Sequence, residues 1–106
     1  MERRECTRYR LACQVRFSWA SEQQERFHGR GITRDISARG AFILAAACPP
    51  DGATVHLKIL IAPDPPDAPT ARLRGDAQVL RVEQAPGGQG QGGFAVVSKG
   101  FALWSP

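Results

Sequence analysis

The amino-acid sequence predicts an all-β protein, a small antiparallel barrel of six strands. Short apolar runs alternate with polar residues at a period of two, most clearly over 11–19 and 55–61, and this period is typical of strands with one buried face. Eleven glycines and eight prolines fall between such runs, where they favour turns. Closing the sheet into a barrel removes the exposed edges that a flat sheet would leave.

The first strand is expected over residues 11–19. Its apolar phase consists of Leu11, Cys13, Val15, Phe17 and Trp19. A second strand is expected over 26–36, where Gly29 and Gly31 indicate a bulge or a close backbone approach. A short third strand is expected over 41–46.

The second half of the chain predicts three further strands. They cover 55–61, 71–84 and 94–97, and the apolar phase of the long one slips near Val79, which indicates a bulge. Between the strands lie a turn at 48–52, a rigid proline-rich loop at 63–69 and a flexible glycine-rich stretch at 86–93. The apolar tail at 101–104 is expected to begin at most a short C-terminal helix.

The stretch from Asp35 to Gly40 reads Asp-Ile-Ser-Ala-Arg-Gly and lies between two apolar runs. It is expected to form a turn at the rim of the sheet, with Asp35 and Ser37 bonded to local backbone and Gly40 at a positive φ. In a second interpretation, Asp35 and Ser37 face outward as an acceptor and a donor for a ligand. The six residues alone do not decide between the two.

Residues 1–10 form a charged, flexible arm that precedes the barrel of residues 11–106, and together they make one domain. The chain has a net charge of +4. In the arm, Arg4 and Arg8 are spaced so that two guanidinium groups can reach around one small ligand. A guanidinium can hold a phosphate or a guanine edge with two hydrogen bonds, or stack on a purine. The alternative is a solvated basic tail.

Other function classes have little support. His28 and His56 have no cysteine, serine or carboxylate at a spacing typical of a triad or a metal pair, so we expect no catalytic residues, no metal and no cofactor. Cys6, Cys13 and Cys48 form no C-x-x-C pair, which favours reduced thiols in a cytosol, with Cys13 buried. No signal peptide and no 18-residue apolar run are present, so no membrane span is expected.

Taken together, the arm and the turn resemble the PilZ domain family, the bacterial receptors for cyclic di-GMP. The resemblance covers about residues 3 to 98. It is carried by Arg4-Glu5-Cys6-Thr7-Arg8 and Asp35-Ile36-Ser37-Ala38-Arg39-Gly40, flanked by Gly31-Ile32 and Ala41-Phe42-Ile43. The fold of the family is a six-stranded antiparallel barrel, often followed by a helix.

The resemblance implies a role for each motif residue. Arg4 and Arg8 would grip the phosphates and guanine faces of cyclic di-GMP. Asp35 and Ser37 would contact a guanine edge and a nearby phosphate, since a carboxylate accepts from guanine N1–H and N2–H2 together. Gly40 would let the backbone approach the ligand without a Cβ clash.

Two neighbouring arginines extend this set. Arg3 and Arg39 would add ligand contacts, and Arg3 would favour a stacked ligand dimer. Arg10 and Arg34 are expected to be surface or strand residues. The hypothesis is a non-enzymatic cyclic di-GMP sensor in the bacterial cytoplasm, whose arm orders on the ligand and alters a surface recognised by an effector protein. We expect a monomer or weak dimer.

Two alternatives remain. The first is a PilZ-type protein-interaction module that binds no nucleotide; such modules typically lack the arginines, so Arg4 and Arg8 count against it. The second is a basic barrel that binds single-stranded nucleic acid, which would need exposed aromatic rings. Phe17 and Trp19 lie on the apolar phase and leave Tyr9 as the main candidate, so no nucleic acid polymer is expected as a partner.

Overall fold

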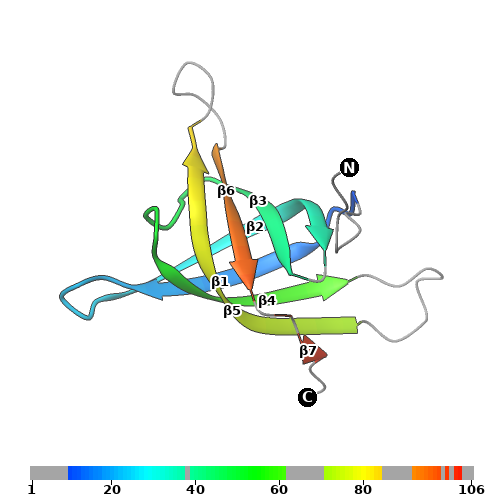
Figure 1. Cartoon of the computed structure of the whole chain (residues 1–106), viewed down its shortest axis with the longest axis horizontal. Coiled ribbons are helices and arrows are strands. Elements are labelled where there is room, and N and C mark those ends of the chain that lie inside the picture. The colour runs from blue at the N-terminus through cyan, green and yellow to red at the C-terminus, as the bar shows by residue number, and fades with distance from the viewer. Residues whose placement is uncertain are drawn as a thin grey trace, which may run out of the picture.

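The structure is a computed structural model that describes residues 10–37, 39–61, 71–84, 92–98 and 100, and the backbone of 102–103. Seven strands and no helix occur in this part of the chain (Figure 1). Their bounds are β1 (Gln14–Ala20), β2 (Arg26–Ser37), β3 (Gly40–Ala45), β4 (Thr54–Ile61), β5 (Ala71–Glu83), β6 (Gly92–Ser98) and β7 (Ala102–Leu103). Over the same residues, no helix is long and apolar enough to cross a membrane.

Six of the strands close into an antiparallel barrel, as predicted. The order is β1-β2-β3-β6-β5-β4, and β4 pairs back with β1. The long strand β5 makes closure possible, because residues 71–78 pair with β4 while residues 77–83 pair with β6.

The expected start of a C-terminal helix is wrong for residues 102 and 103. They form the two-residue strand β7, which pairs with Leu73 and Arg74 of β5. Because β6 pairs with β5 only from Ala77 onward, the first part of β5 offers unpaired backbone groups on that edge, and β7 satisfies some of them.

The interior is filled by the apolar phase of each strand. Phe17 lies at its centre, with ring centroids 5.0 Å from Phe94 in an edge-to-face contact and 5.8 Å from Trp19 in a stacked one. Cys13 is 5% exposed and packs in this core, as the sequence predicts. The first strand begins later than predicted, at Gln14, and Leu11 is exposed.

The two glycines of β2 mark close approaches rather than a bulge. A Cβ at Gly29 would lie 2.4 Å from the Phe17 ring, and one at Gly31 would lie 2.5 Å from the Leu44 carbonyl oxygen. The close-approach part of the prediction is therefore confirmed.

The irregularity in β2 lies further along the strand, where the register shifts between Thr33 and Asp35. A second shift lies between Val79 and Arg81 of β5, where the sequence predicts a bulge. Both shifts lie in the part of the barrel formed by β2, β3, β6 and β5. The first shift places Arg34 beside the Asp35–Gly40 turn.

Candidate functional site

The turn between β2 and β3 directs Asp35 and Ser37 to the outside of the barrel. The register pairs Asp35 with Phe42 and Ser37 with Gly40, and Ile36 between them is buried in the core. Ser37 also makes local bonds: its Oγ donates to the Gly40 carbonyl and accepts from the Arg39 N–H, both at 3.4 Å. Ser37 thus combines the local bonding and the outward orientation that the sequence leaves as alternatives, whereas the Asp35 carboxylate accepts from the Arg34 side chain.

Gly40 does not have the positive φ that the sequence predicts. Among the described glycines, that conformation occurs at Gly52 and Gly100. Gly40 instead begins strand β3 beside β6, where a Cβ would lie 2.7 Å from the Val96 carbonyl oxygen. The glycine is needed because a neighbouring backbone approaches closely.

Arg34 holds the carboxylate of Asp35. Its Nε donates to Asp35 Oδ2 at 3.1 Å, and the Asp35 side chain is 19% exposed. The guanidinium carbon of Arg34 also lies 4.0 Å from the centroid of the Phe42 ring, and that of Arg81 lies 5.8 Å from it. Arg34 is a surface residue, as predicted, but it is also the residue that orients Asp35, and no sequence pattern indicates this.

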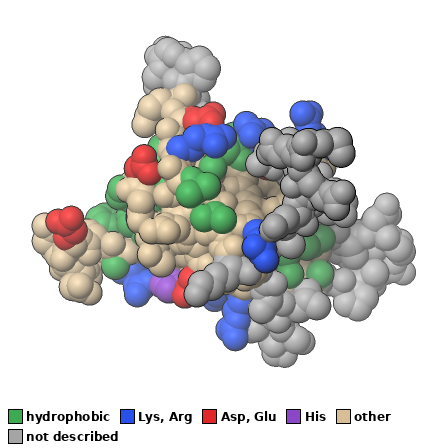
Figure 2. Space-filling model, viewed as in Figure 1, with side chains coloured by type: hydrophobic (Ala, Val, Ile, Leu, Met, Phe, Trp, Pro, Cys, Tyr) green, Lys and Arg blue, Asp and Glu red, His purple; other side chains and the backbone are tan. Residues whose placement is uncertain are grey.

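Small and apolar residues share the outer face with the turn. Phe42 pairs with Ala95, and Gly40 pairs with Val97, which is 40% exposed. Arg81 of β5 pairs with Ala95 of β6. In Figure 2, hydrophobic side chains lie in the middle of the viewed face, with Lys and Arg side chains above them.

This face therefore combines a carboxylate, a hydroxyl, an apolar floor and guanidinium groups. Such a set can hold a planar, hydrogen-bonding anion: the carboxylate accepts from ring N–H groups, and the guanidinium groups face negative charge. We call the outer surface of β2, β3, β6 and β5 around these residues the turn face.

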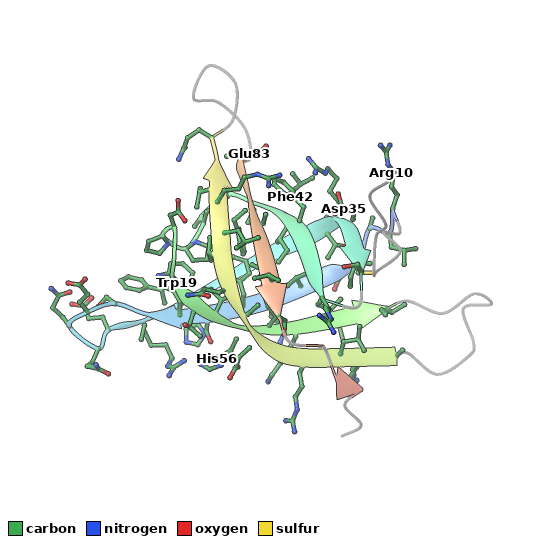
Figure 3. All side chains as sticks on the ribbon, viewed as in Figure 1. Arg10, Trp19, Asp35, Phe42, His56 and Glu83 are labelled. Atoms are coloured by element: carbon green, nitrogen blue, oxygen red, sulfur yellow. The ribbon has the colours of Figure 1, made fainter. Side chains whose placement is uncertain are left out.

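The segment before β1 is tied to β2 next to this face. The Thr33 side chain is 1% exposed, and its hydroxyl donates to the Leu11 carbonyl and accepts from the Cys13 N–H at 2.8 Å. The Thr33 N–H also donates to the Cys13 carbonyl at 2.9 Å. Arg10 therefore lies at the same end of the barrel as Asp35 (Figure 3).

Comparison with known families agrees with this fold and with the two sequence motifs. The model of the PilZ domain matches residues 2–100. The chain belongs to the PilZ domain family. PilZ domains form a family of cyclic di-GMP receptors and act as receptor or adaptor modules.

A solved structure supports the PilZ fold independently. The Bacillus subtilis inhibitor of motility, MotI/DgrA, superposes with a TM-score of 0.70 at 20% sequence identity. The match covers 96% of this chain and 45% of that one, so this chain spans less than half the length of MotI/DgrA. No curated protein matches the sequence.

In this PilZ domain, the structure brings part of the predicted site together. Asp35, Ser37 and Gly40 lie on the turn face. The Arg39 backbone connects the turn to β6, since its carbonyl accepts from the Ser98 N–H at 2.7 Å. The predicted arm residues lie outside the described part of the chain; they are Arg3, Arg4 and Arg8.

One side-chain pair differs from what the sequence predicts. No carboxylate is expected near His56, yet β4–β5 pairing sets it opposite Asp76, with His56 Nδ1 against Asp76 Oδ1, and both side chains are more than half exposed. Ser18 lies opposite His56 on the other side but accepts from Arg26 at 3.4 Å. Across the described residues, no three His, Cys, Asp or Glu side chains are grouped as metal ligands.

Proposed function

We propose that this PilZ domain binds cyclic di-GMP on the turn face, between the Asp35–Gly40 turn and the arginines Arg4 and Arg8 of the arm. The observation that carries the proposal is the attachment of residues 11–13 to Thr33, two positions before Asp35. The arm thus starts beside the outward-facing carboxylate and hydroxyl.

Each part of the site has a distinct task. Asp35, oriented by Arg34, accepts from the N1–H and N2–H2 of guanine, and Ser37 bonds a nearby ligand oxygen. Arg4 and Arg8 reach over the ligand and bind its two phosphates, each through a guanidinium fork. Binding orders the arm against the barrel and changes the surface that a partner protein contacts. The site needs no metal or cofactor.

The neighbouring arginines enlarge the positive surface around the ligand. Arg39 is exposed in the turn, and Arg3 adjoins Arg4 in the sequence. A ligand with two phosphate charges is attracted to this concentration of cations. We propose Arg3 as the residue that favours a second, stacked ligand molecule.

Isothermal titration of the purified domain with cyclic di-GMP tests the proposal. We expect saturable binding at micromolar ligand, strongly reduced in Arg8→Ala and retained in Arg10→Ala, which removes the same charge from the same segment. The absence of heat with the native protein would favour the protein-interaction module that binds no nucleotide.

A further inference from the structure

The first part of β2 is paired on one side only. Residues 26–32 pair with β1, but β3 reaches back along β2 only as far as Gly31, which pairs with Ala45. After Ala45 the chain bends and leads to β4, and the end of the β1–β2 hairpin projects from the barrel (Figure 1). Within the described part of the chain, residues 26–30 thus form an open sheet edge. We call it the hairpin edge.

The main-chain groups on the open side come from every second residue of β2. The Thr33 N–H donates to the carbonyl of Cys13, directly before β1, at 2.9 Å. Bonded residues alternate along an antiparallel strand, so the odd-numbered residues of this part of β2 bond to β1 and the even-numbered ones face away. The outward groups therefore belong to Arg26, His28 and Arg30. Among the described residues, no main-chain bond uses them.

The pairing of β3 gives the same alternation independently. The carbonyl of Arg39, directly before β3, accepts from the Ser98 N–H of β6 at 2.7 Å. The odd-numbered residues of β3 therefore bond to β6, and the even-numbered ones face β2. Leu44 is one of these and pairs with Ile32, so Ile32 faces β3. Four positions earlier, His28 faces the same way, where β3 is absent.

The hairpin edge ends on an exposed aromatic ring. Phe27 is 40% exposed and stacks on Trp19, with ring centroids 5.4 Å apart. Trp19 pairs with Phe27 on one side and with the buried Val55 on the other. One row of apolar side chains thus crosses β4, β1 and β2 and stops at the open edge. An apolar side chain on an added strand would extend this row and cover the ring.

The charges of the hairpin edge disfavour a second copy of the same edge. Two copies paired antiparallel about His28 would set Arg26 of each opposite Arg30 of the other. Like charges directly opposite one another destabilise a sheet, and charged side chains are a common protection of edges against self-pairing. The basic arm is disfavoured for the same reason.

We propose that the hairpin edge binds an extended segment of a partner protein, which adds antiparallel to β2 as a further strand. All pairs of the sheet are antiparallel in the described residues. Main-chain bonds to β2 give such a segment its affinity, and its alternate side chains give specificity. Apolar residues would meet Phe27, and carboxylates would meet Arg26 and Arg30 on the other face.

Neighbouring polar groups are compatible with carboxylates at these positions. The Arg26 guanidinium donates to Ser18 Oγ at 3.4 Å, an exposed contact with a neutral group that leaves its charge in place. Asp76 is three strands from β2 in the sheet, about 14 Å away, where exposed charges are largely screened.

The hairpin edge is separate from the turn face. His28 and Asp35 lie on the same strand, about 23 Å apart at 3.3 Å per residue. Strand addition uses main-chain groups of residues 26–30, none of which belongs to the proposed nucleotide site. The inference therefore does not depend on cyclic di-GMP binding.

The test uses a labelled peptide of about seven residues in which isoleucine and glutamate alternate. In an antiparallel strand beside β2, the glutamate nitrogens donate to β2 and the isoleucine nitrogens face away. Two N-methylated forms, one methylated at the glutamates and one at the isoleucines, keep the same side chains. Fluorescence anisotropy should show saturable binding of the unmethylated and isoleucine-methylated forms, and at least about tenfold weaker binding of the glutamate-methylated form.

Two variants at His28 test the protein side. His28→Pro removes an outward N–H and no bond to β1, so it should fold, as proline is tolerated at strand edges. It should weaken the unmethylated peptide at least about tenfold, whereas His28→Ala keeps the N–H and should bind normally. Both variants should bind cyclic di-GMP like the native protein, which separates this edge from the turn face.

Amide hydrogen exchange gives a direct measurement on the native protein. The N–H groups of His28 and Arg30 should exchange faster than that of Gly29, which bonds to β1, and should slow when the peptide binds. Protection of His28 and Arg30 in the free monomer would overturn the proposal, as would no saturable peptide binding or equal binding of the two N-methylated forms. The reverse order of those forms would overturn the antiparallel direction. Protection that rises with protein concentration alone would assign the edge to a second copy instead.

Discussion

The buried hydroxyl of Thr33 donates a hydrogen bond to the main-chain carbonyl of Leu11. This contact joins the start of the barrel to β2 beside the turn face. It explains how a charged arm, remote from Asp35 in sequence, starts next to that carboxylate. Thr33 is therefore a positioning residue for the proposed site.

Replacing Thr33 by valine should destabilise the fold and weaken cyclic di-GMP binding together. Valine keeps the shape but leaves the Cys13 N–H and the Leu11 carbonyl without their partner, at a cost of about 1–3 kcal/mol. Urea denaturation measures the loss, and Thr54→Val, at an exposed position, is the matched control. An unchanged denaturation midpoint in Thr33→Val would contradict this role.

Asp35→Ala should reduce the preference for guanine more than the attraction for phosphate. The carboxylate pairs with N–H groups that adenine does not present, whereas the arginines bind the phosphates of either dinucleotide. Titrations with cyclic di-GMP and cyclic di-AMP measure the two effects. Asp76→Ala is the control: it removes an exposed carboxylate that lies against His56 and not on the turn face, and it should change neither affinity. Equal losses for both ligands in Asp35→Ala would refute the assignment.

Gly40→Asn and Gly52→Asn should have opposite outcomes. Asparagine tolerates a positive φ, so Gly52, with φ of 84° and open space around it, should accept the change with little loss of stability. At Gly40 the new Cβ would meet the Val96 carbonyl, a backbone group that cannot move without displacing β6. We expect a loss of about 1–3 kcal/mol in thermal or urea unfolding. If Gly40→Asn and Gly52→Asn were equally stable, β3 and β6 could move apart without a loss of stability.

The strands could be predicted because each carries its own signal. Alternation along Val15, Phe17 and Trp19, and along Val55, Leu57 and Ile59, specifies which face is buried without reference to any other strand. The outward orientation of Asp35 and Ser37 follows in the same way from Ile36 between them. These local patterns were enough for the barrel and for part of the turn face.

Most of the missed features depend on which strands pair and in what register. His56 meets Asp76 only because β4 pairs with β5. The prediction of a positive φ at Gly40 was wrong. A side chain is excluded there by the backbone of β6, which is far away in the sequence. Pairing partners leave no trace in a single sequence, so such contacts could not be predicted.

Arg34→Lys should weaken guanine recognition although it keeps the positive charge. Lysine offers no Nε–H in a fixed fork to hold Asp35 Oδ2 and no planar group to cover the Phe42 ring. The stacking contact contributes about 0.5–1 kcal/mol at an exposed site, so the loss of stability should be small. The affinity for cyclic di-GMP should fall about fivefold and that for cyclic di-AMP much less, because the Asp35 carboxylate loses its orientation.

Arg81→Lys is the matched control, since Arg81 lies farther from the ring, at 5.8 Å, and binds Glu83 instead of Asp35. If Arg34→Lys and Arg81→Lys changed the ratio of the two affinities equally, Arg34 would act through surface charge and not by orienting Asp35.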